Sequence, residues 1–128
     1  MISVLNVYGP YKDREPFWIQ IKAIGLLWAS NLILGGELNF TLSSSEQWGT
    51  KHTDPLSGFF NNLIQVSGLI DMYPIESSPT WRNGRMDDQG TAKRLDRFLM
   101  YDGLALKLER YRVWHAHSAI SDHIPVCL

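Results

Sequence analysis

The chain has 128 residues, of which 45% are hydrophobic and 20% charged, and its formal net charge is −1. This length and composition predict one globular domain, residues 1–128, and exclude a largely disordered chain. The single cysteine, Cys127, excludes an intrachain disulfide, and no run approaches the ~18 apolar residues of a membrane span. We therefore expect a protein of the cytoplasm or nucleus that has no contact with a membrane.

The chain opens with a strand pattern that is followed by a helix pattern. Residues 2–8 are rich in β-branched and aromatic types on both faces and stop at Gly9–Pro10, which predicts an interior strand. Asp13 is expected to cap a helix that begins between residues 14 and 16. Apolar residues then recur at spacings of four, three and four, a stripe expected to pack on a sheet: Phe17, Ile21, Ile24 and Trp28.

A short apolar run at residues 32–34 is followed directly by Gly35–Gly36. This pattern predicts a fully buried strand and then a tight backbone bend. Residues that follow such a bend are held at the carboxyl end of the strand, where reactive side chains project in sheet-based enzymes. Glu37 and Asn39 are therefore candidates for chemistry.

The rest of the chain is expected to contain one more helix and several strands. Residues 41–53 are polar and predict a loop, and a second helix is expected from Asp54 or Pro55 to Ser67, with Gly68 at its stop position. Its apolar side would be Phe59, Phe60, Leu63, Ile64 and Val66. Strands are predicted at Leu69–Tyr73, Thr80–Trp81, Lys93–Tyr101, Tyr111–Trp114 and Ile124–Leu128. This order of elements predicts an α/β domain with a mixed sheet.

Acids, an amide and a histidine lie at or near the ends of these predicted strands. Hydrolysis of a phosphodiester needs a group that activates water, charge that stabilises the pentacovalent phosphorus, and usually a divalent cation. Glu37 and Asn39 can orient a water or a phosphate, and Glu37 and Asp122 can hold a metal through oxygen. His123 can donate a proton to a phosphate oxygen, and Asp96 can fix its tautomer.

Each of these residues also has a purely structural interpretation. A Gly-Gly-Glu sequence is commonly a turn with a solvated acid, and an Asp-His pair beside a terminal strand is commonly a surface pair. Asp96 lies in an apolar run, so it needs either a catalytic partner or an ion pair with Arg94 or Arg97. The remaining histidines are interpreted as surface residues: His52, His115 and His117.

Basic side chains are unevenly distributed along the chain. Residues 81–117 carry more Lys and Arg than Asp and Glu, whereas residues 1–80 carry fewer. A basic segment that contains Asp96 and precedes His123 suits a polyanionic partner such as nucleic acid. The alternative interpretation is that these arginines form an ordinary solvated face.

The ordered combination of these motifs resembles the C-terminal part of the endonuclease/exonuclease/phosphatase superfamily. The sequence is most similar to the endonuclease domain encoded by plant LINE-type retrotransposons. The resemblance spreads across the whole chain and is carried by Asn6–Pro10, Leu34–Asn39, Pro79–Gly84, Arg94–Leu99 and Ser121–Pro125.

The resemblance implies a fold and a role for each matching residue. The fold would be part of a four-layer α/β sandwich, in which mixed sheets pack together and helices cover the outsides. Tyr8 would contact the scissile phosphate, Asn39 would position the nucleophilic water, and Asp96 would orient the catalytic His123. Asp122 would lie close to a Mg²⁺ or Mn²⁺ ion. Trp81 would be a largely structural aromatic residue beside the substrate.

Two departures from the family pattern bear on activity. Glu37 stands where the family has an aspartate, and a carboxylate displaced by about 1 Å can cost ~100-fold in rate. The family's first strands, which supply further magnesium ligands, have no counterpart in this sequence. We therefore expect an N-terminally truncated, nuclease-derived domain that is catalytically weak or inactive and binds nucleic acid or protein.

Two enzymatic alternatives remain open from the sequence. The chain can be an active Mg²⁺-dependent DNA endonuclease or phosphodiesterase, because it has the residues that the resemblance makes catalytic: Tyr8, Asn39, Asp96, Asp122 and His123. It can also be a phosphatase that acts on a small phosphorylated ligand. Truncation would uncover a strand edge and part of an apolar sheet face, so we expect a homodimer or another protein partner to cover them.

Overall fold

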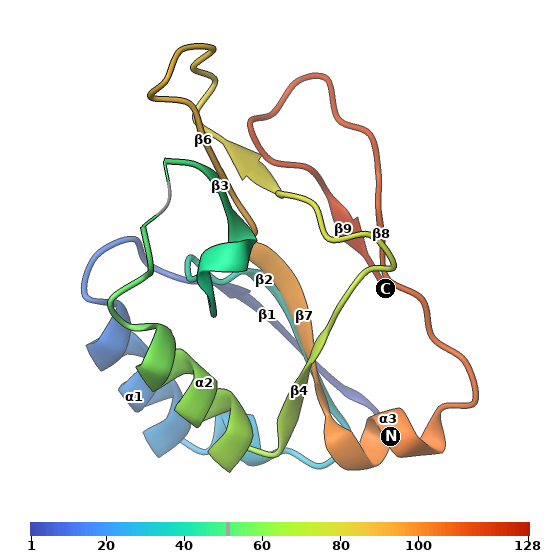
Figure 1. Ribbon diagram of the computed structural model, residues 1–128. Coiled ribbons are helices and arrows are strands. Elements are labelled where there is room, and N and C mark those ends of the chain that lie inside the picture. Colours follow the sequence, from blue (N-terminus) through green and yellow to red (C-terminus); the bar gives the residue numbers. More distant parts are fainter. Residues whose placement is uncertain (51) are drawn as a thin grey trace.

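The computed structural model describes residues 1–50 and 52–128 (Figure 1). The strands are β1 (Ser3–Tyr8), β2 (Leu32–Glu37), β3 (Gln47–Gly49), β4 (Leu69–Met72), β5 (Trp81–Arg82), β6 (Thr91–Lys93), β7 (Asp96–Tyr101), β8 (Trp114–His115) and β9 (Val126–Cys127). The helices are α1 (Arg14–Ala23), α2 (Ser57–Val66) and α3 (Asp102–Lys107), with short 3-10 turns η1 (Leu26–Trp28) and η2 (Ser44–Glu46). Within the described ranges, no helix is both long enough and apolar enough to cross a membrane.

The largest sheet has the strand order β1-β2-β7-β4. β1 and β2 are parallel and are joined through α1, whereas β7 runs antiparallel to both of its neighbours. A second, antiparallel sheet has the order β3-β6-β5, and β8 pairs with β9. In Figure 1, α1 and α2 lie on one side of the large sheet, and the two smaller sheets lie above these helices. The predicted α/β class with a mixed sheet is confirmed.

The main core lies between the large sheet and the helices α1 and α2. Trp18 of α1 is 1% exposed, and it meets the rings of Phe40 and Phe60 edge-on. The Phe40 and Phe60 rings stack with their centroids 4.1 Å apart. A separate cluster forms beside α3 and contains Met72, Met100, Leu104 and Val113. Aromatic packing of this kind, rather than helix propensity, fixes α1 and α2 on the sheet.

The first strand is an edge strand, so the prediction of an interior strand is wrong. β1 lies at one end of the sheet order and pairs only with β2 in the described part of the chain. Its side chains alternate between a covered and an open face, and Val4 on the open face is 74% exposed. The apolar composition of both faces therefore does not reflect burial in this structure.

The predicted apolar stripe of the first helix is only half right. Its first two members pack against the core, but Ile24 and Trp28 are 62% and 67% exposed. The physical reason is that α1 ends at Ala23 and Gly25 takes a left-handed conformation, with φ 82°, which breaks the helical period. Trp18 fills the core position instead.

The starts of the two long helices also differ from the prediction. Asp13 has φ 53° and its carboxylate makes no capping hydrogen bond, so the predicted cap is wrong. α2 begins at Ser57 because the Asp54 carboxylate accepts a backbone N–H two residues later and pairs with Arg14. Gly68 follows the end of α2 with φ 64°, as expected of a stop residue. Val66, expected on the apolar side, is exposed.

The second strand does not bend at its glycines. β2 continues through Gly35 and Gly36 to Glu37. A side chain at Gly35 would collide with the Phe98 ring, and one at Gly36 would collide with the Val7 carbonyl oxygen. These glycines are therefore required for the close approach of neighbouring strands, and not for a turn.

Several elements in the second half of the chain differ from the prediction. The strand predicted at 93–101 is divided into β6 and β7, because the chain passes from one sheet to the other at Arg94–Leu95. The predicted loop at 41–53 contains η2 and β3, and its residue Lys51 lies outside the described residues. The six-residue α3 was not predicted, and the last two predicted strands are reduced to β8 and β9.

Candidate active site

Three of the candidate residues lie side by side at one end of the large sheet. Strand register places Tyr8 opposite Glu37, and Glu37 opposite Asp96. Tyr8 and Glu37 end their parallel strands, whereas Asp96 begins the antiparallel β7. Because an antiparallel strand starts where its neighbours finish, the pairing of β2 with β7 brings residues from distant parts of the sequence to one edge.

The imidazole of His123 lies between two carboxylates. Its Nδ1 is 2.8 Å from Oδ2 of Asp96, and its Nε2 is 3.6 Å from Oε2 of Glu37. The His123 side chain is 25% exposed, so the contact lies at the protein surface and is partly desolvated. The sequence analysis selected these three residues as candidates, and the structure brings both carboxylates next to the imidazole.

The backbone around His123 is held by the segment that includes β5. The N–H of Ile124 donates to the Thr80 carbonyl at 2.7 Å, and the N–H of Arg82 donates to the Asp122 carbonyl at 3.2 Å. Trp81 forms an isolated bridge with His123, and its indole Nε1–H donates to Oδ2 of Asp122 at 3.0 Å. Trp81 thus holds the backbone and the acid next to the histidine.

The charged neighbours of His123 change its protonation. Partial burial alone would lower the pKa of His123, but the hydrogen bond and charge of Asp96, with smaller contributions from Glu37 and Asp122, raise it above its ordinary value. A histidine with a raised pKa stays protonated over a wider pH range. In its protonated form it can donate a hydrogen bond to a phosphate oxygen.

Asn39 is held beside this group by two hydrogen bonds. It has a left-handed backbone conformation, with φ 57°, which asparagine tolerates better than most residues. Its Nδ2 donates to the Gly9 carbonyl at 2.5 Å, and its own carbonyl accepts from Arg14 at 3.0 Å. The position of Asn39 is thereby fixed, while its role in orienting water stays a prediction.

A cavity of about 750 Å³ opens over these residues. Its lining includes five residues selected from the sequence: Tyr8, Glu37, Asn39, Asp122 and His123. It also includes residues that sequence reasoning missed or interpreted otherwise, namely Tyr11, Arg14, His52 and Lys93. His52 is exposed, as expected, but it faces the cavity. Nothing in its polar local sequence indicates this placement.

Three side chains can share a metal ion at this site. Glu37, Asp96 and His123 each offer one ligand atom, and these atoms all lie within 4.8 Å of one another. The Asp122 carboxylate is outside this group and accepts a hydrogen bond from Trp81. Two carboxylates and an imidazole form a donor set that suits several divalent cations.

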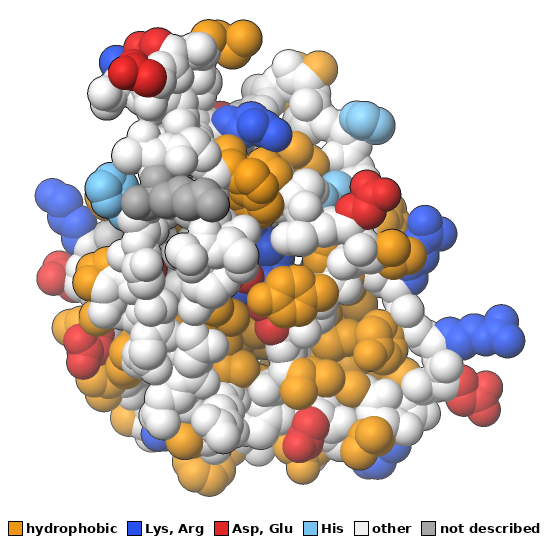
Figure 2. All heavy atoms as spheres, in the orientation of Figure 1, with side chains coloured by type: hydrophobic (Ala, Val, Ile, Leu, Met, Phe, Trp, Pro, Cys, Tyr) orange, Lys and Arg blue, Asp and Glu red, His pale blue; other side chains and the backbone are white. Residues whose placement is uncertain are grey.

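The basic side chains on the face shown in Figure 2 do not form one large patch among the described residues. On the face shown in Figure 2, Lys and Arg side chains among the described residues are scattered over the surface. Two of the arginines of the basic segment 81–117, Arg94 and Arg97, are buried. The excess of basic residues seen in the sequence is therefore only partly available to a polyanionic partner.

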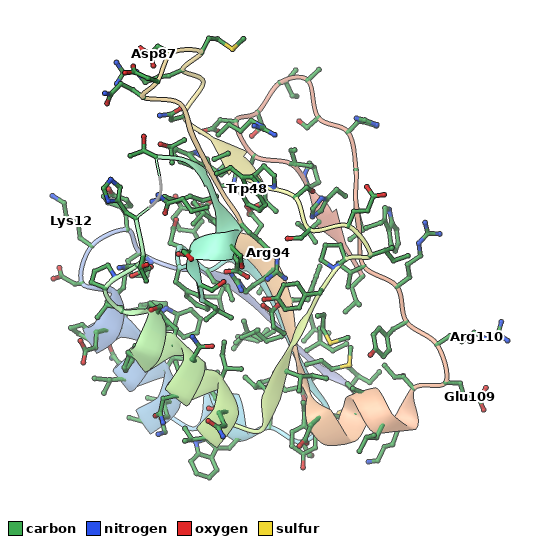
Figure 3. All side chains as sticks on the ribbon, viewed as in Figure 1. Lys12, Trp48, Asp87, Arg94, Glu109 and Arg110 are labelled. Carbon is green, nitrogen blue, oxygen red and sulfur yellow. The ribbon has the colours of Figure 1, made fainter. Side chains whose placement is uncertain are left out.

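Arg94 and Arg97 pair with other acids than Asp96. Arg94 lies 2.7 Å from Asp71 and 2.9 Å from Glu46, and Arg97 lies 2.7 Å from Asp71 and 2.8 Å from Glu46. Figure 3 shows Arg94 inside the fold, whereas Arg110 extends away from it. Of the two alternatives left open for Asp96, the structure therefore shows the pairing with the histidine.

The other histidines differ in their surroundings. His115 is half-buried, and its Nδ1 lies 2.7 Å from the Ser78 hydroxyl. Partial burial, with the nearby charge of Arg94, lowers the pKa of His115. His117 is exposed. The two do not share a strand, because β8 ends at His115.

Comparisons with known proteins support the fold. No protein-family model and no curated protein matches the chain. Among solved structures, the chain is similar to the endonuclease domain of TRAS1, a telomere-specific non-LTR retrotransposon, with a TM-score of 0.67 and 23% identity over 93% of this chain and 52% of that one. It is also similar to the 3′-5′ exonuclease NExo from Neisseria meningitidis, with a TM-score of 0.70 and 22% identity over 96% of this chain and 59% of that one.

The chain spans between half and three-fifths of the length of these two nucleases. At these identities the similarity establishes the architecture and leaves the activity to be argued from the site. The chain has a nuclease-type α/β fold.

Proposed function

We propose that this chain is a nuclease-derived domain that binds nucleic acid through the cavity and cleaves it weakly or not at all. The proposal rests on the placement of His123 at the cavity. Its Nδ1 lies 2.8 Å from Oδ2 of Asp96, and its Nε2 faces Glu37. The protonated imidazole can donate to a backbone phosphate. Tyr8 and Tyr11 are exposed at the same cavity and offer rings for stacking with bases.

The acids of the site favour binding over turnover. One carboxylate oxygen of Asp96 contacts His123, and one of Asp122 accepts the indole N–H of Trp81. Mg²⁺ keeps several waters and needs one or two carboxylates held in place. Glu37 and Asp122, two acids that line the cavity, would hold Mg²⁺ or Mn²⁺ if Asp122 moved towards the group formed by Glu37, Asp96 and His123. The metal would supply charge that stabilises the phosphate, and it would be retained weakly because Asp122 already accepts the indole N–H of Trp81.

An active Mg²⁺-dependent endonuclease is the second candidate. The observation that favours it is the orientation of His123, whose Nδ1 is fixed by Asp96 so that Nε2 faces the cavity. An imidazole held in this way is suited to protonate or hydrogen-bond a reacting phosphate. The nucleases with a similar fold bring this activity into consideration for the present chain.

One experiment separates the two candidates. Binding of a fluorescent oligonucleotide is measured by anisotropy in EDTA and in Mg²⁺, together with plasmid nicking, for the native chain, His123→Ala and the control His117→Ala. The proposal expects binding without nicking, weakened in His123→Ala and unchanged in His117→Ala. Metal-dependent nicking that is lost in His123→Ala would establish the endonuclease, and absence of both binding and nicking would contradict both candidates.

We also propose a protein partner at the edge of the large sheet, namely a second copy of this chain. In the described ranges the outer edge of β1 pairs with no strand, and residues 2–8 carry no charged side chain that would discourage pairing. The open face of β1 exposes Ile2 and Val4. Two copies can pair through β1 about a two-fold axis, since such an interface is self-complementary.

A further inference from the structure

The contact between Asp96 and His123 joins two segments that are far apart in the sequence. Asp96 is the first residue of β7, immediately after the chain leaves the smaller sheet. His123 lies outside the named strands and is held by an isolated bridge to Trp81. The position of each residue therefore depends on backbone contacts made by residues outside the pair.

Thr80 makes hydrogen bonds to both segments. Its hydroxyl oxygen accepts the backbone N–H of Leu95 at 2.9 Å and that of Asp96 at 3.0 Å. Its carbonyl accepts the N–H of Ile124 at 2.7 Å, and its own N–H donates to the Lys93 carbonyl at 2.9 Å. One residue thus contacts the end of β6, the start of β7 and the residue that follows His123.

The chemistry of Thr80 suits it for this task. It is completely buried, so its hydroxyl has no exchange with bulk water to weaken these bonds. A single oxygen with two lone pairs can accept both N–H groups, and a methyl group in its place would leave them without this acceptor. Serine keeps the same oxygen, whereas valine keeps the shape and loses it.

We infer that Thr80 is the positioning residue that sets Asp96 and His123 at hydrogen-bond distance. Its hydroxyl fixes the backbone of Asp96, and its carbonyl fixes the backbone next to His123. Thr80 does not line the cavity and does not touch either reacting side chain, so it acts through them. Its importance for function rests on the proposed binding of nucleic acid at His123, but its effect on the pair is measured in the protein alone.

The test compares Thr80→Val with Thr80→Ser in EDTA by NMR. The readout is the downfield proton resonance of His123 Nδ1–H, together with the ring nitrogen shifts that report the tautomer. Asp96→Asn provides the reference for a pair without its charged acceptor. We expect the native chain and Thr80→Ser to show the resonance, and Thr80→Val to lose it and to resemble Asp96→Asn. A Thr80→Val protein that is folded and keeps the native resonance would overturn the inference.

A second measurement needs no substitution. In the native chain, the amides of Leu95 and Asp96 should exchange with deuterium much more slowly than the amide of the exposed residue Met86. Rapid exchange at Leu95 and Asp96 would overturn the inference even if Thr80→Val does not fold. If the native chain binds no oligonucleotide but these signals are as expected, the proposed function fails while the role of Thr80 stands.

Discussion

Two clusters of acids and bases lie on either side of the same short segment, and they differ in burial and in charge balance. The buried cluster consists of Glu46, Asp71, Arg94 and Arg97, with side chains 0–8% exposed. The open cluster consists of Glu37, Asp96 and His123, with side chains 19–25% exposed. Arg94 and Arg97 flank Asp96 in the sequence, so β7 and the turn before it contribute to both clusters.

The comparison shows what separates a structural ion cluster from one suited to chemistry. In the buried cluster two guanidinium groups face two carboxylates, so the charges balance, and the terminal nitrogens of both arginines donate within the protein. In the open cluster two carboxylates face one imidazole at the wall of a cavity. The excess of negative charge raises the pKa of His123 and suits a cation.

The largest expected effect comes from breaking the buried cluster. Arg97→Leu leaves Glu46 and Asp71 with one guanidinium between them in a dry environment. Removing one partner of a buried pair typically costs about 3–5 kcal/mol of unfolding free energy. Urea denaturation followed by circular dichroism measures this loss.

An exposed arginine provides the matched control for that experiment. Arg85 lies 3.6 Å from Asp87, and both side chains are more than half exposed. Arg85→Leu should change the unfolding free energy by less than about 1 kcal/mol. Equal losses in Arg97→Leu and Arg85→Leu would show that the buried cluster contributes nothing special to stability.

The two clusters should respond to pH in opposite directions. Burial alone would raise the pKa of Glu46, but Arg97, with further help from a backbone N–H and Arg94, lowers it below its ordinary value of 4.5. Its stabilisation is therefore present above pH 4.5 and is lost as pH falls through the depressed pKa of the folded state. Unfolding free energies measured between pH 7 and pH 3 should fall on the acid side. A flat profile over that interval would contradict the role given to Glu46.

His123 should behave in the opposite way, with a smaller effect. Because its pKa is raised in the folded state, its stabilisation is complete below the ordinary value of 6.5 and is lost as pH rises through the raised pKa. Asp96→Asn should lower the pKa of His123 in an NMR titration performed in EDTA. An unchanged His123 titration would mean that Asp96 does not control its protonation.

The two clusters should be affected least by a substitution at the edge of β1, because this edge lies outside both. Val4→Lys places a charge on the exposed face of β1 and should convert a dimer to a monomer in light scattering, without changing the unfolding transition of the monomer. Ile75→Lys, at an exposed position outside the named strands, should leave the dimer intact. A native chain that is monomeric at micromolar concentration would refute the proposed pairing.

The sequence indicated the open cluster better than the buried one. Glu37, Asp96 and His123 lie at the ends of recognisable apolar runs, and these ends meet at one edge of the sheet. Glu46 lies in a polar stretch that was predicted as a loop, so its pairing with Arg94 and Arg97 had no local signal. A pattern read along the chain reports which residues begin or end an element, whereas partners across the fold depend on tertiary packing.

The dependence on tertiary packing also explains the errors in the predicted elements. β3 has three residues and exists because it pairs with β6, far away in the sequence. Trp28 matched the predicted helical spacing but lies outside α1, because the helix ends before the left-handed Gly25. Thr80 was expected only as part of a short strand, since its hydrogen bonds to Leu95 and Asp96 involve residues that the local sequence does not connect to it.

We propose that His123, held by Asp96 and facing Glu37, contacts the phosphate backbone of bound nucleic acid. The most direct test is an NMR titration of the isotope-labelled native chain with a short single-stranded oligonucleotide in EDTA. We predict chemical-shift changes concentrated at Tyr8, Glu37 and His123, with His117 unaffected. Changes confined to other surfaces, or none at millimolar oligonucleotide, would contradict the claim.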